Sequence, residues 1–128
     1  MKVVLSFLLF LFSFMSFAQN IKEYQWKNRL LVLVSKEPNS WESKQQRKIF
    51  EQNQLQLEER NMLLLNRQAN SQDLARFSLD KNFEGVVLIG KDGGVKLKKP
   101  FLIKPQVIFD LVDTMPMRRL EMQNTNKY

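Results

Sequence analysis

The chain has 128 residues, a formal charge of +7, no cysteine and no histidine. The absence of cysteine excludes thiol redox chemistry, thiolate nucleophiles, disulfides and cysteine–metal sites. The absence of histidine excludes Ser-His and Cys-His catalysis and histidine–metal sites. We therefore expect one small domain that is stabilised by packing and holds no metal ion and no cofactor.

The N-terminus has the pattern of an export signal. Met1-Lys2 is a short basic start, residues 3–17 are almost wholly apolar, and Ser16-Phe17-Ala18 places small residues at the recognition positions of a cleavage site. A membrane anchor would need roughly twenty apolar residues, and this run has about fifteen. We expect residues 1–18 to be a cleaved signal peptide. Residues 19–128 then form one exported domain, periplasmic or secreted, with no transmembrane helix.

Two apolar runs predict strands in the first half of the domain. Residues 30–34 suit a strand that is buried on both faces, and residues 62–65 suit a second strand. Between them, Asn39 and Glu42 form a capping-box pattern, which predicts a helix over residues 41–54. Before the first strand, residues 21–26 fit either an edge strand or a packed lead-in.

A β-hairpin is the clearest feature of the second half. A short helix is expected near residues 71–79, and a third strand at 86–89. Asp92, Gly93 and Gly94 then supply the turn chemistry of a hairpin, because Asp-Gly and Gly-Gly allow positive φ. The same turn amides, with Lys91, offer an alternative function as an anion cradle.

The chain ends with an amphipathic helix and a basic tail. Residues 95–98 alternate apolar and basic, as an edge strand does. Residues 105–115 place one apolar face on a helix that Pro116 interrupts. Met115, Pro116 and Met117 fit helix termination and core filling, or alternatively an adaptable contact surface for a partner. Residues 123–126 are expected to be frayed.

The order of these elements predicts the fold class. Long crossovers favour parallel pairing of the first three strands, and the hairpin makes the fourth antiparallel to the third. We predict an α/β, thioredoxin-like fold, β-α-β-α-β-β-α with a mixed four-stranded sheet, in preference to a ferredoxin-like arrangement.

Several short motifs are specific when they are taken together. They are Gly90-Lys91-Asp92-Gly93-Gly94-Val95-Lys96, Met115-Pro116-Met117-Arg118-Arg119 with Glu121 behind it, Trp26-Lys27-x-Arg29 before the first strand, and Glu59-Arg60 before the second. On these motifs, nearly all of residues 19–128 resembles the bacterial domain-of-unknown-function family 4174.

The resemblance implies a thioredoxin-like fold related to peroxiredoxin-like domains of some animal secreted matrix proteins, and it implies no established activity. In working thioredoxins the reactive cysteine pair lies where the first strand meets the first helix. The corresponding residues 35–40 contain no thiol, and residues 82–84 contain no counterpart of the thioredoxin cis-proline. The usual redox mechanism is therefore excluded.

The basic residues of the last third lead to our first hypothesis, a non-catalytic module that binds a protein or a polyanionic envelope component. The residues expected to contact such a partner are Lys91, Lys96, Lys98, Arg118 and Arg119. The alternative is a solvated basic face that protects an edge strand. Nucleic acid is not expected as a partner, because the chain is exported and the patch lacks interleaved aromatic residues.

Two further hypotheses stay open. One is a thiol-independent hydrolase that uses Glu59, Asp113 and nearby arginines, although a structural ion pair with Arg29 or Arg60 is an alternative assignment for these carboxylates. The other is a degenerate redox partner that docks thiol enzymes, which predicts an exposed apolar rim over residues 38–41.

Overall fold

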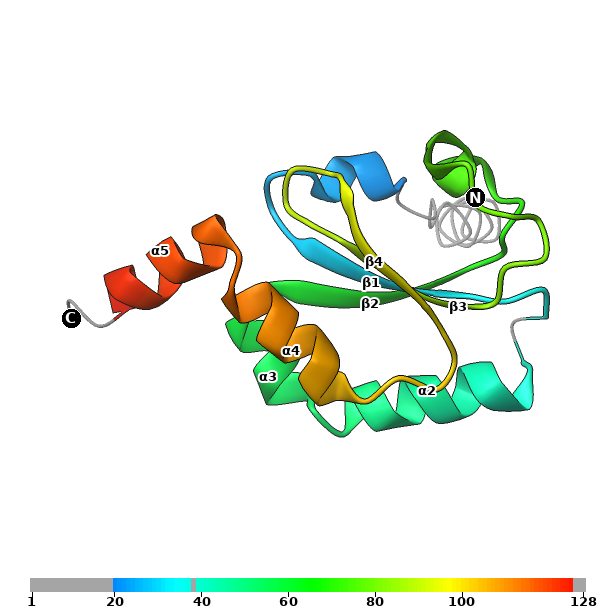
Figure 1. The fold of residues 1–128 in the computed structure, drawn as a ribbon, viewed down its shortest axis with the longest axis horizontal. Coiled ribbons are helices and arrows are strands. Elements are labelled where there is room, and N and C mark those ends of the chain that lie inside the picture. The colour runs from blue at the N-terminus through cyan, green and yellow to red at the C-terminus, as the bar shows by residue number, and fades with distance from the viewer. Residues whose placement is uncertain (1–19, 38, 126–128) are drawn as a thin grey trace, which may run out of the picture.

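The computed structural model of the protein describes residues 20–37 and 39–125, so the predicted signal peptide lies outside the described residues (Figure 1). The strands are β1 (Arg29–Val34), β2 (Met62–Arg67), β3 (Gly85–Ile89) and β4 (Val95–Pro100). The α-helices are α2 (Trp41–Glu51), α3 (Gln54–Glu59), α4 (Pro105–Asp113) and α5 (Pro116–Thr125), and the 3-10 helices are η1 (Ile21–Tyr24) and η2 (Gln72–Phe77).

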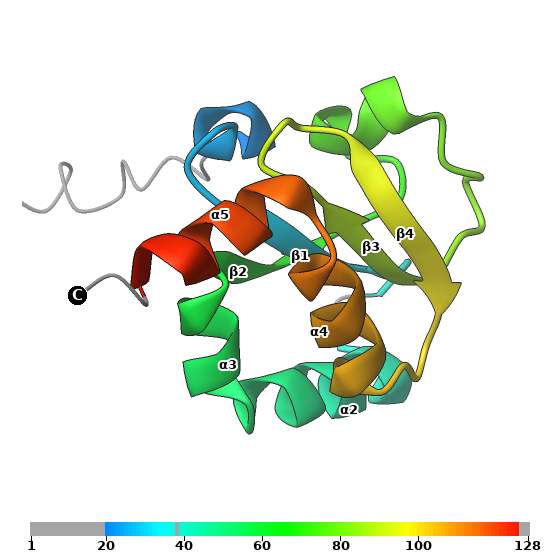
Figure 2. The ribbon, with the colours of Figure 1, turned by 60° about the vertical axis from the view of Figure 1, so that its left-hand side comes forward.

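The four strands form one mixed sheet in the order β2-β1-β3-β4, which confirms the predicted α/β class and the mixed four-stranded sheet. Each face of the sheet carries an apolar cluster. On one face Leu31 and Leu88 pack with Phe50 and Ile108 from α2 and α4, and on the other face Val32 packs with residues of η1 and η2. The α-helices therefore cover one face and the 3-10 segments cover the other (Figures 1 and 2).

The direction of β3 differs from our prediction. β1 pairs parallel to β2 but antiparallel to β3, with Val34 opposite both Arg67 and Gly85. The reason lies in the connection between β2 and β3, which contains only a short 3-10 helix. This connection passes over one face of the sheet, where Leu74 of η2 packs in the apolar cluster, and then returns to the end at which β2 finished, so β3 begins where β1 and β2 end. The strand order does not conflict with the thioredoxin-like assignment, which stays a prediction.

Several element boundaries also differ. The first helix is capped by Ser40, whose Oγ accepts from the Ser43 N–H, and not by Asn39. This helix ends at Glu51 and not at residue 54, because the chain bends at Gln52 and Asn53. A separate helix, α3, begins at Gln54. Residues 21–24 are a packed lead-in with Ile21 buried, and not a strand. Pro116 does interrupt the last helix, but it also begins a new one, α5, as proline favours a first helical position.

A fully buried glutamine joins α2 to the segment before α4. Gln46 donates from Nε2 to the Ile103 carbonyl over 2.9 Å and accepts from the Ile103 N–H over 2.7 Å. The backbone of Ile103 has left the sheet, so this side chain takes the place of a strand neighbour. Gln46 therefore fixes the start of α4 relative to α2.

We predict that Gln46→Leu lowers the free energy of unfolding by about 1–3 kcal/mol, because it leaves the N–H and carbonyl of Ile103 unpaired. Urea unfolding measures the change. The control Gln52→Leu alters the exposed glutamine that caps the C-terminal end of the same helix. Its free energy of unfolding should stay within about 0.5 kcal/mol of wild type. Equal stabilities for the two variants would contradict the bridging role of Gln46.

Candidate functional site

A buried guanidinium lies at the first residue of β1. Arg29 is 1% exposed, and its Nη1 and Nη2 donate to Glu121 Oε2 and Oε1 over 3.1 and 3.2 Å. Its Nη1 also donates to the Arg60 carbonyl over 2.8 Å. This two-pronged geometry is the strong form of an arginine–carboxylate pair, and it ties the C-terminal helix α5 to the central strand of the sheet.

Glu121 accepts from a second cation. Lys91, in the turn after β3, donates from Nζ to Glu121 Oε1. Burial alone would raise the pKa of Glu121, but the hydrogen bonds from Arg29 and Lys91 outweigh it, so its pKa lies below the ordinary value of 4.5. Glu121 is therefore ionised at neutral pH and hydrogen-bonded to two cations, and Arg118 Nη1 lies 3.9 Å from its Oε2.

Asp113, the last residue of α4, is held between two arginines. Arg60 donates from Nε and Nη2 to the two carboxylate oxygens over 3.0 and 2.9 Å, and Arg118 donates from Nε to Oδ1 over 3.1 Å. Burial alone would raise the pKa of Asp113, but the hydrogen bonds from Arg60 and Arg118 have the larger effect, so its pKa lies below the ordinary value of 3.8. We call Arg29, Arg60, Lys91, Asp113, Arg118 and Glu121 the ion network.

The ion network holds α5 on the domain. No residue of α5 is buried, and the helix projects from the body beside α4 (Figure 1). Arg118 additionally donates from Nη1 to the Glu59 carbonyl over 2.9 Å, at the end of α3. Arg118 and Glu121 are three residues apart on one side of α5, where Arg118 contacts α3 and α4 and Glu121 contacts β1 and the β3–β4 turn. The opposite, apolar side is left in solvent.

The predicted hairpin turn is present and closes on itself. Gly93 has φ 85°, which only glycine adopts readily, and its N–H donates to the Gly90 carbonyl. The Gly94 N–H donates to Asp92 Oδ1, and Lys96 Nζ donates to Asp92 Oδ2 over 2.8 Å. The hydrogen bonds from Lys96 and then from Gly94 lower the pKa of Asp92. Because the amides of Gly93 and Gly94 are already bound within the turn, the anion-cradle hypothesis gains no donor there.

A cavity of about 100 Å³ opens where the hairpin turn meets the start of α5. Its walls are Arg29, Gly90, Lys91, Asp92, Lys96, Met115, Pro116 and Met117. Segments that are far apart in the sequence therefore converge: the start of β1, the β3–β4 turn and the α4–α5 junction. Of the predicted site residues, the cavity unites Lys91 and Lys96 with the structural motif residues Asp92 and Met115–Met117.

The family model of the domain of unknown function DUF4174 matches residues 20–121. The chain belongs to this family. The match covers every residue of the cavity and the whole ion network, up to Glu121 itself. No curated protein and no solved structure matched the chain.

The structure separates the predicted contact residues of this DUF4174 domain into three kinds. Lys91 and Arg118 lie in the ion network, and Lys96 is paired with Asp92. Lys98 and Arg119 are exposed and have no acidic partner among residues 20–37 and 39–125. A bulge in β4 also breaks the expected strand alternation, because Leu97 faces Leu88 while Val95 faces Ile89.

The two carboxylates of the hydrolase hypothesis meet the same arginine. Arg60 contacts Asp113 over 2.9 Å and Glu59 over 3.9 Å, so the expected structural ion pair of Arg60 is found. Glu59 is mostly exposed, and the lowered pKa of Asp113 keeps that carboxylate without a proton at neutral pH. Asp113 therefore lacks the raised pKa of a general acid.

Two features escaped the sequence analysis. Of the two arginines expected to pair with Glu59 or Asp113, Arg60 does so, whereas Arg29 pairs with Glu121. The three-residue spacing of Arg118 and Glu121 places both on one side of a helix and could have indicated Glu121 as part of this site. Trp26 was quoted only as part of a motif, yet its side chain is 64% exposed. Trp41 is exposed to the same degree, as the predicted apolar rim requires, while Pro38 lies outside the described residues.

The described part of the chain lacks two other features. Within residues 20–37 and 39–125, no group of three or more acidic side chains is placed to hold a metal ion. No helix in the same part of the chain is long and apolar enough to cross a membrane.

We predict that Glu121→Gln lowers the free energy of unfolding at pH 7 by about 1–3 kcal/mol, because the guanidinium of Arg29 stays buried without its carboxylate. Chemical denaturation measures this change. The control Glu58→Gln removes an exposed carboxylate of α3 and should have little effect.

The two carboxylates of the ion network, Glu121 and Asp113, also make the stability of the protein depend on pH. Lowered pKa values in the folded state mean that the carboxylates stabilise the protein fully above their ordinary values of 4.5 and 3.8. This stabilisation is lost as the pH falls through those values towards the lower folded pKa, and the loss should be smaller in Glu121→Gln. An identical pH profile in both proteins would contradict the assignment.

Proposed function

We propose that the protein is an exported, non-catalytic binding module for a partner that carries negative charge. The observation that carries this proposal is the edge strand β4, where Lys96, Lys98 and Lys99 are all exposed. Lys96 has an acidic partner, and the other two have none among the described residues. The strand therefore offers positive charge that the fold itself does not use.

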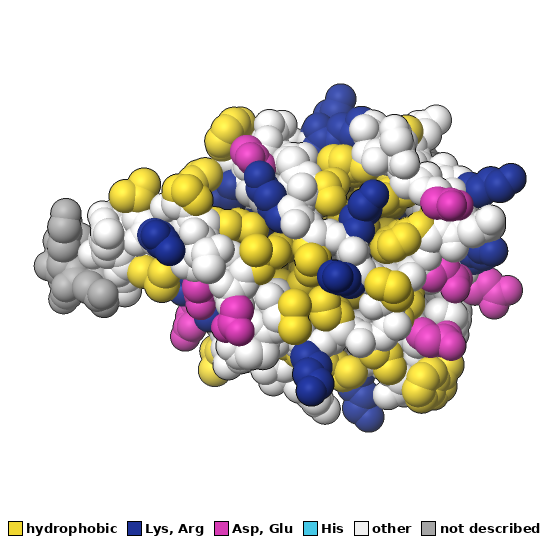
Figure 3. Space-filling view, in the orientation of Figure 1, with side chains coloured by type: hydrophobic (Ala, Val, Ile, Leu, Met, Phe, Trp, Pro, Cys, Tyr) yellow, Lys and Arg dark blue, Asp and Glu magenta, His cyan; other side chains and the backbone are white. Residues whose placement is uncertain are grey.

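The distribution of charge over the surface supports the proposal. Figure 3 shows lysine and arginine side chains over the face that carries β4 and α5, with acidic side chains mostly towards its margins. The carboxylates Asp113 and Glu121 are bound inward by the ion network. Their charge is therefore neutralised within the protein, and the exposed cations remain available to a partner.

The acid–base properties of the site favour binding over catalysis. A general acid needs a pKa near the working pH, and a hydrolase built on a pair of carboxylates needs the two in different protonation states. Asp113 and Glu121 both have lowered pKa values and are each held by two cations. This arrangement fixes charge and position, which suits a recognition surface.

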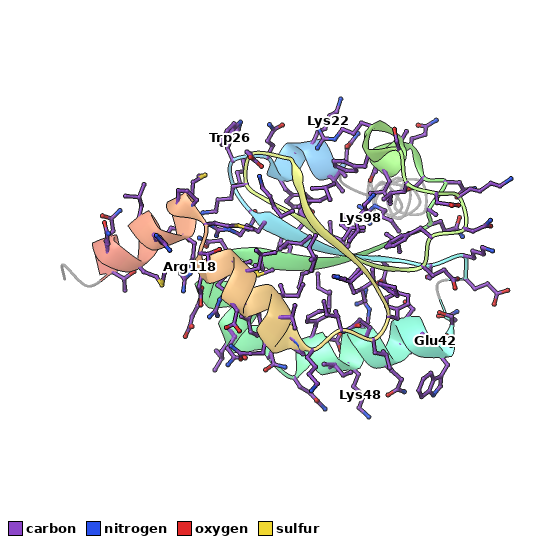
Figure 4. All side chains as sticks on the ribbon, viewed as in Figure 1. Lys22, Trp26, Glu42, Lys48, Lys98 and Arg118 are labelled. Atoms are coloured by element: carbon purple, nitrogen blue, oxygen red, sulfur yellow. The ribbon has the colours of Figure 1, made fainter. Side chains whose placement is uncertain are left out.

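The triple variant Lys98→Gln, Lys99→Gln and Arg119→Gln tests the proposal. We expect it to bind immobilised polyglutamate at least about fivefold more weakly than wild type, since three exposed ion pairs contribute a few tenths of a kcal/mol or more each. The control triple Lys44→Gln, Lys48→Gln and Lys81→Gln removes the same charge elsewhere; Lys48 lies on α2, far from Lys98 (Figure 4).

Polyglutamate affinity, measured at several salt concentrations, decides between the two triples. If both weaken binding to the same degree, only net charge matters and the β4 face has no specific function. Heparin and phosphatidylglycerol vesicles, run in parallel, show whether the face prefers carboxylates or other anions.

Export is tested on the protein made with its own leader in a bacterial host. We expect the mature chain to begin at Gln19, because Ser16-Phe17-Ala18 fits a signal-peptidase site. The N-terminal sequence and intact mass of periplasmic and medium fractions measure this. A full-length chain that begins at Met1 and stays with the membrane would show an uncleaved anchor instead.

A further inference from the structure

Trp26 occupies a backbone position that does not suit it. Its φ is 68°, in the left-handed region where glycine and asparagine are common and a bulky side chain is strained. The position is fixed by its surroundings, since the Trp26 N–H donates to the Lys91 carbonyl over 2.6 Å and the amides of Lys27 and Asn28 both donate to Tyr24. The indole is 64% exposed, so it adds little to the core that would offset the strain.

The backbone of Trp26 is hydrogen-bonded to a residue that lines the cavity at the start of α5. Lys91, whose carbonyl accepts from the Trp26 N–H, lines the cavity together with Met117. Figure 1 shows the turn before β1 on the side of the sheet from which α5 projects. Met117 and Leu120, three residues apart on α5, are exposed as well. Met117 lines the cavity, while Trp26 and Leu120 are exposed on the turn and the helix that carry its walls. Methionine adapts readily to different contacts.

The cavity also carries an excess of positive charge. Arg29, Lys91 and Lys96 line it, and the carboxylates that neutralise them are Asp92 and Glu121. Three cations thus share two carboxylates. A purely apolar partner would leave this charge uncompensated, whereas a purely anionic partner would leave the indole and the methionine without a contact.

We propose that Trp26, Met117 and Leu120, with the cavity between the β3–β4 turn and α5, bind a protein segment that carries both an acidic and an apolar side chain. This inference rests on the proposed function, and it names the partner as a protein. Trp26 is the anchor, because a tryptophan that is exposed in the free protein and desolvated in a complex commonly dominates binding energy. The acidic side chain meets the cations of the cavity.

The strain at Trp26 allows its contribution to binding to be separated from folding. Trp26→Gly and Trp26→Asn place residues that accept positive φ at this position. Both variants should therefore unfold at the wild-type urea concentration or above it. Trp41→Ala is the matched control, because it removes an indole of equal exposure from the start of α2.

The test selects binders for the exported wild-type protein from a display library of random twelve-residue peptides. We expect the selected peptides to be enriched in Asp or Glu next to a large apolar residue. Their affinity, measured by fluorescence polarisation, should fall at least tenfold in Trp26→Gly and Trp26→Asn and stay unchanged in Trp41→Ala.

Other results would overturn the inference. They are a failure to select peptides, peptides without acidic residues, peptides that bind equally well without Trp26, and peptides that depend on Trp41. Polyglutamate binding by Trp26→Gly shows whether the peptide site alone is wrong or whether the proposed function is wrong as well. If polyglutamate still depends on Lys98, Lys99 and Arg119, the binding module stands and only the protein segment at Trp26 is wrong.

Discussion

The buried guanidinium of Arg29 is the constraint on which the site depends. A charge that is removed from water at the start of a central strand is costly unless a carboxylate meets it with good geometry. Glu121 does so with two hydrogen bonds, and it lies on α5, a helix that contributes no buried residue of its own. The need to neutralise Arg29 therefore decides where the last helix lies. The cavity beside Met117 exists because α5 is held there.

The ion network divides the charges of the protein between two tasks. Asp113 and Glu121 face inward, are each shared by two cations, and have lowered pKa values. Their ionised form persists over the neutral range, so the geometry of the site does not change with modest changes in pH. The lysines of β4 face outward. A surface with fixed carboxylates inside and unpaired cations outside is suited to recognising a negatively charged partner.

Local signals in the sequence predicted local structure well. The apolar runs of β1 and β3 and the Asp92-Gly93 turn depend on burial and backbone preference, which a few neighbouring residues determine. The direction of β3 depends instead on how the β2–β3 connection packs, and no short pattern records that. Glu121 was missed for the same reason, since its partner Arg29 is distant in sequence and α5 lacks an apolar face turned towards the core. The strain at Trp26 follows from tertiary contacts with Lys91 and could be seen only in the structure.

A double-mutant cycle between Arg29 and Glu121 tests the central claim most directly. Arg29→Met, Glu121→Gln and the double variant are unfolded in urea, and the coupling free energy is taken from the four stabilities. The account predicts a coupling of at least about 1 kcal/mol, because Glu121→Gln leaves the buried guanidinium of Arg29 without a carboxylate and Arg29→Met removes both guanidinium hydrogen bonds from Glu121. Additive effects, within about 0.3 kcal/mol, would show that α5 is held by something other than this pair.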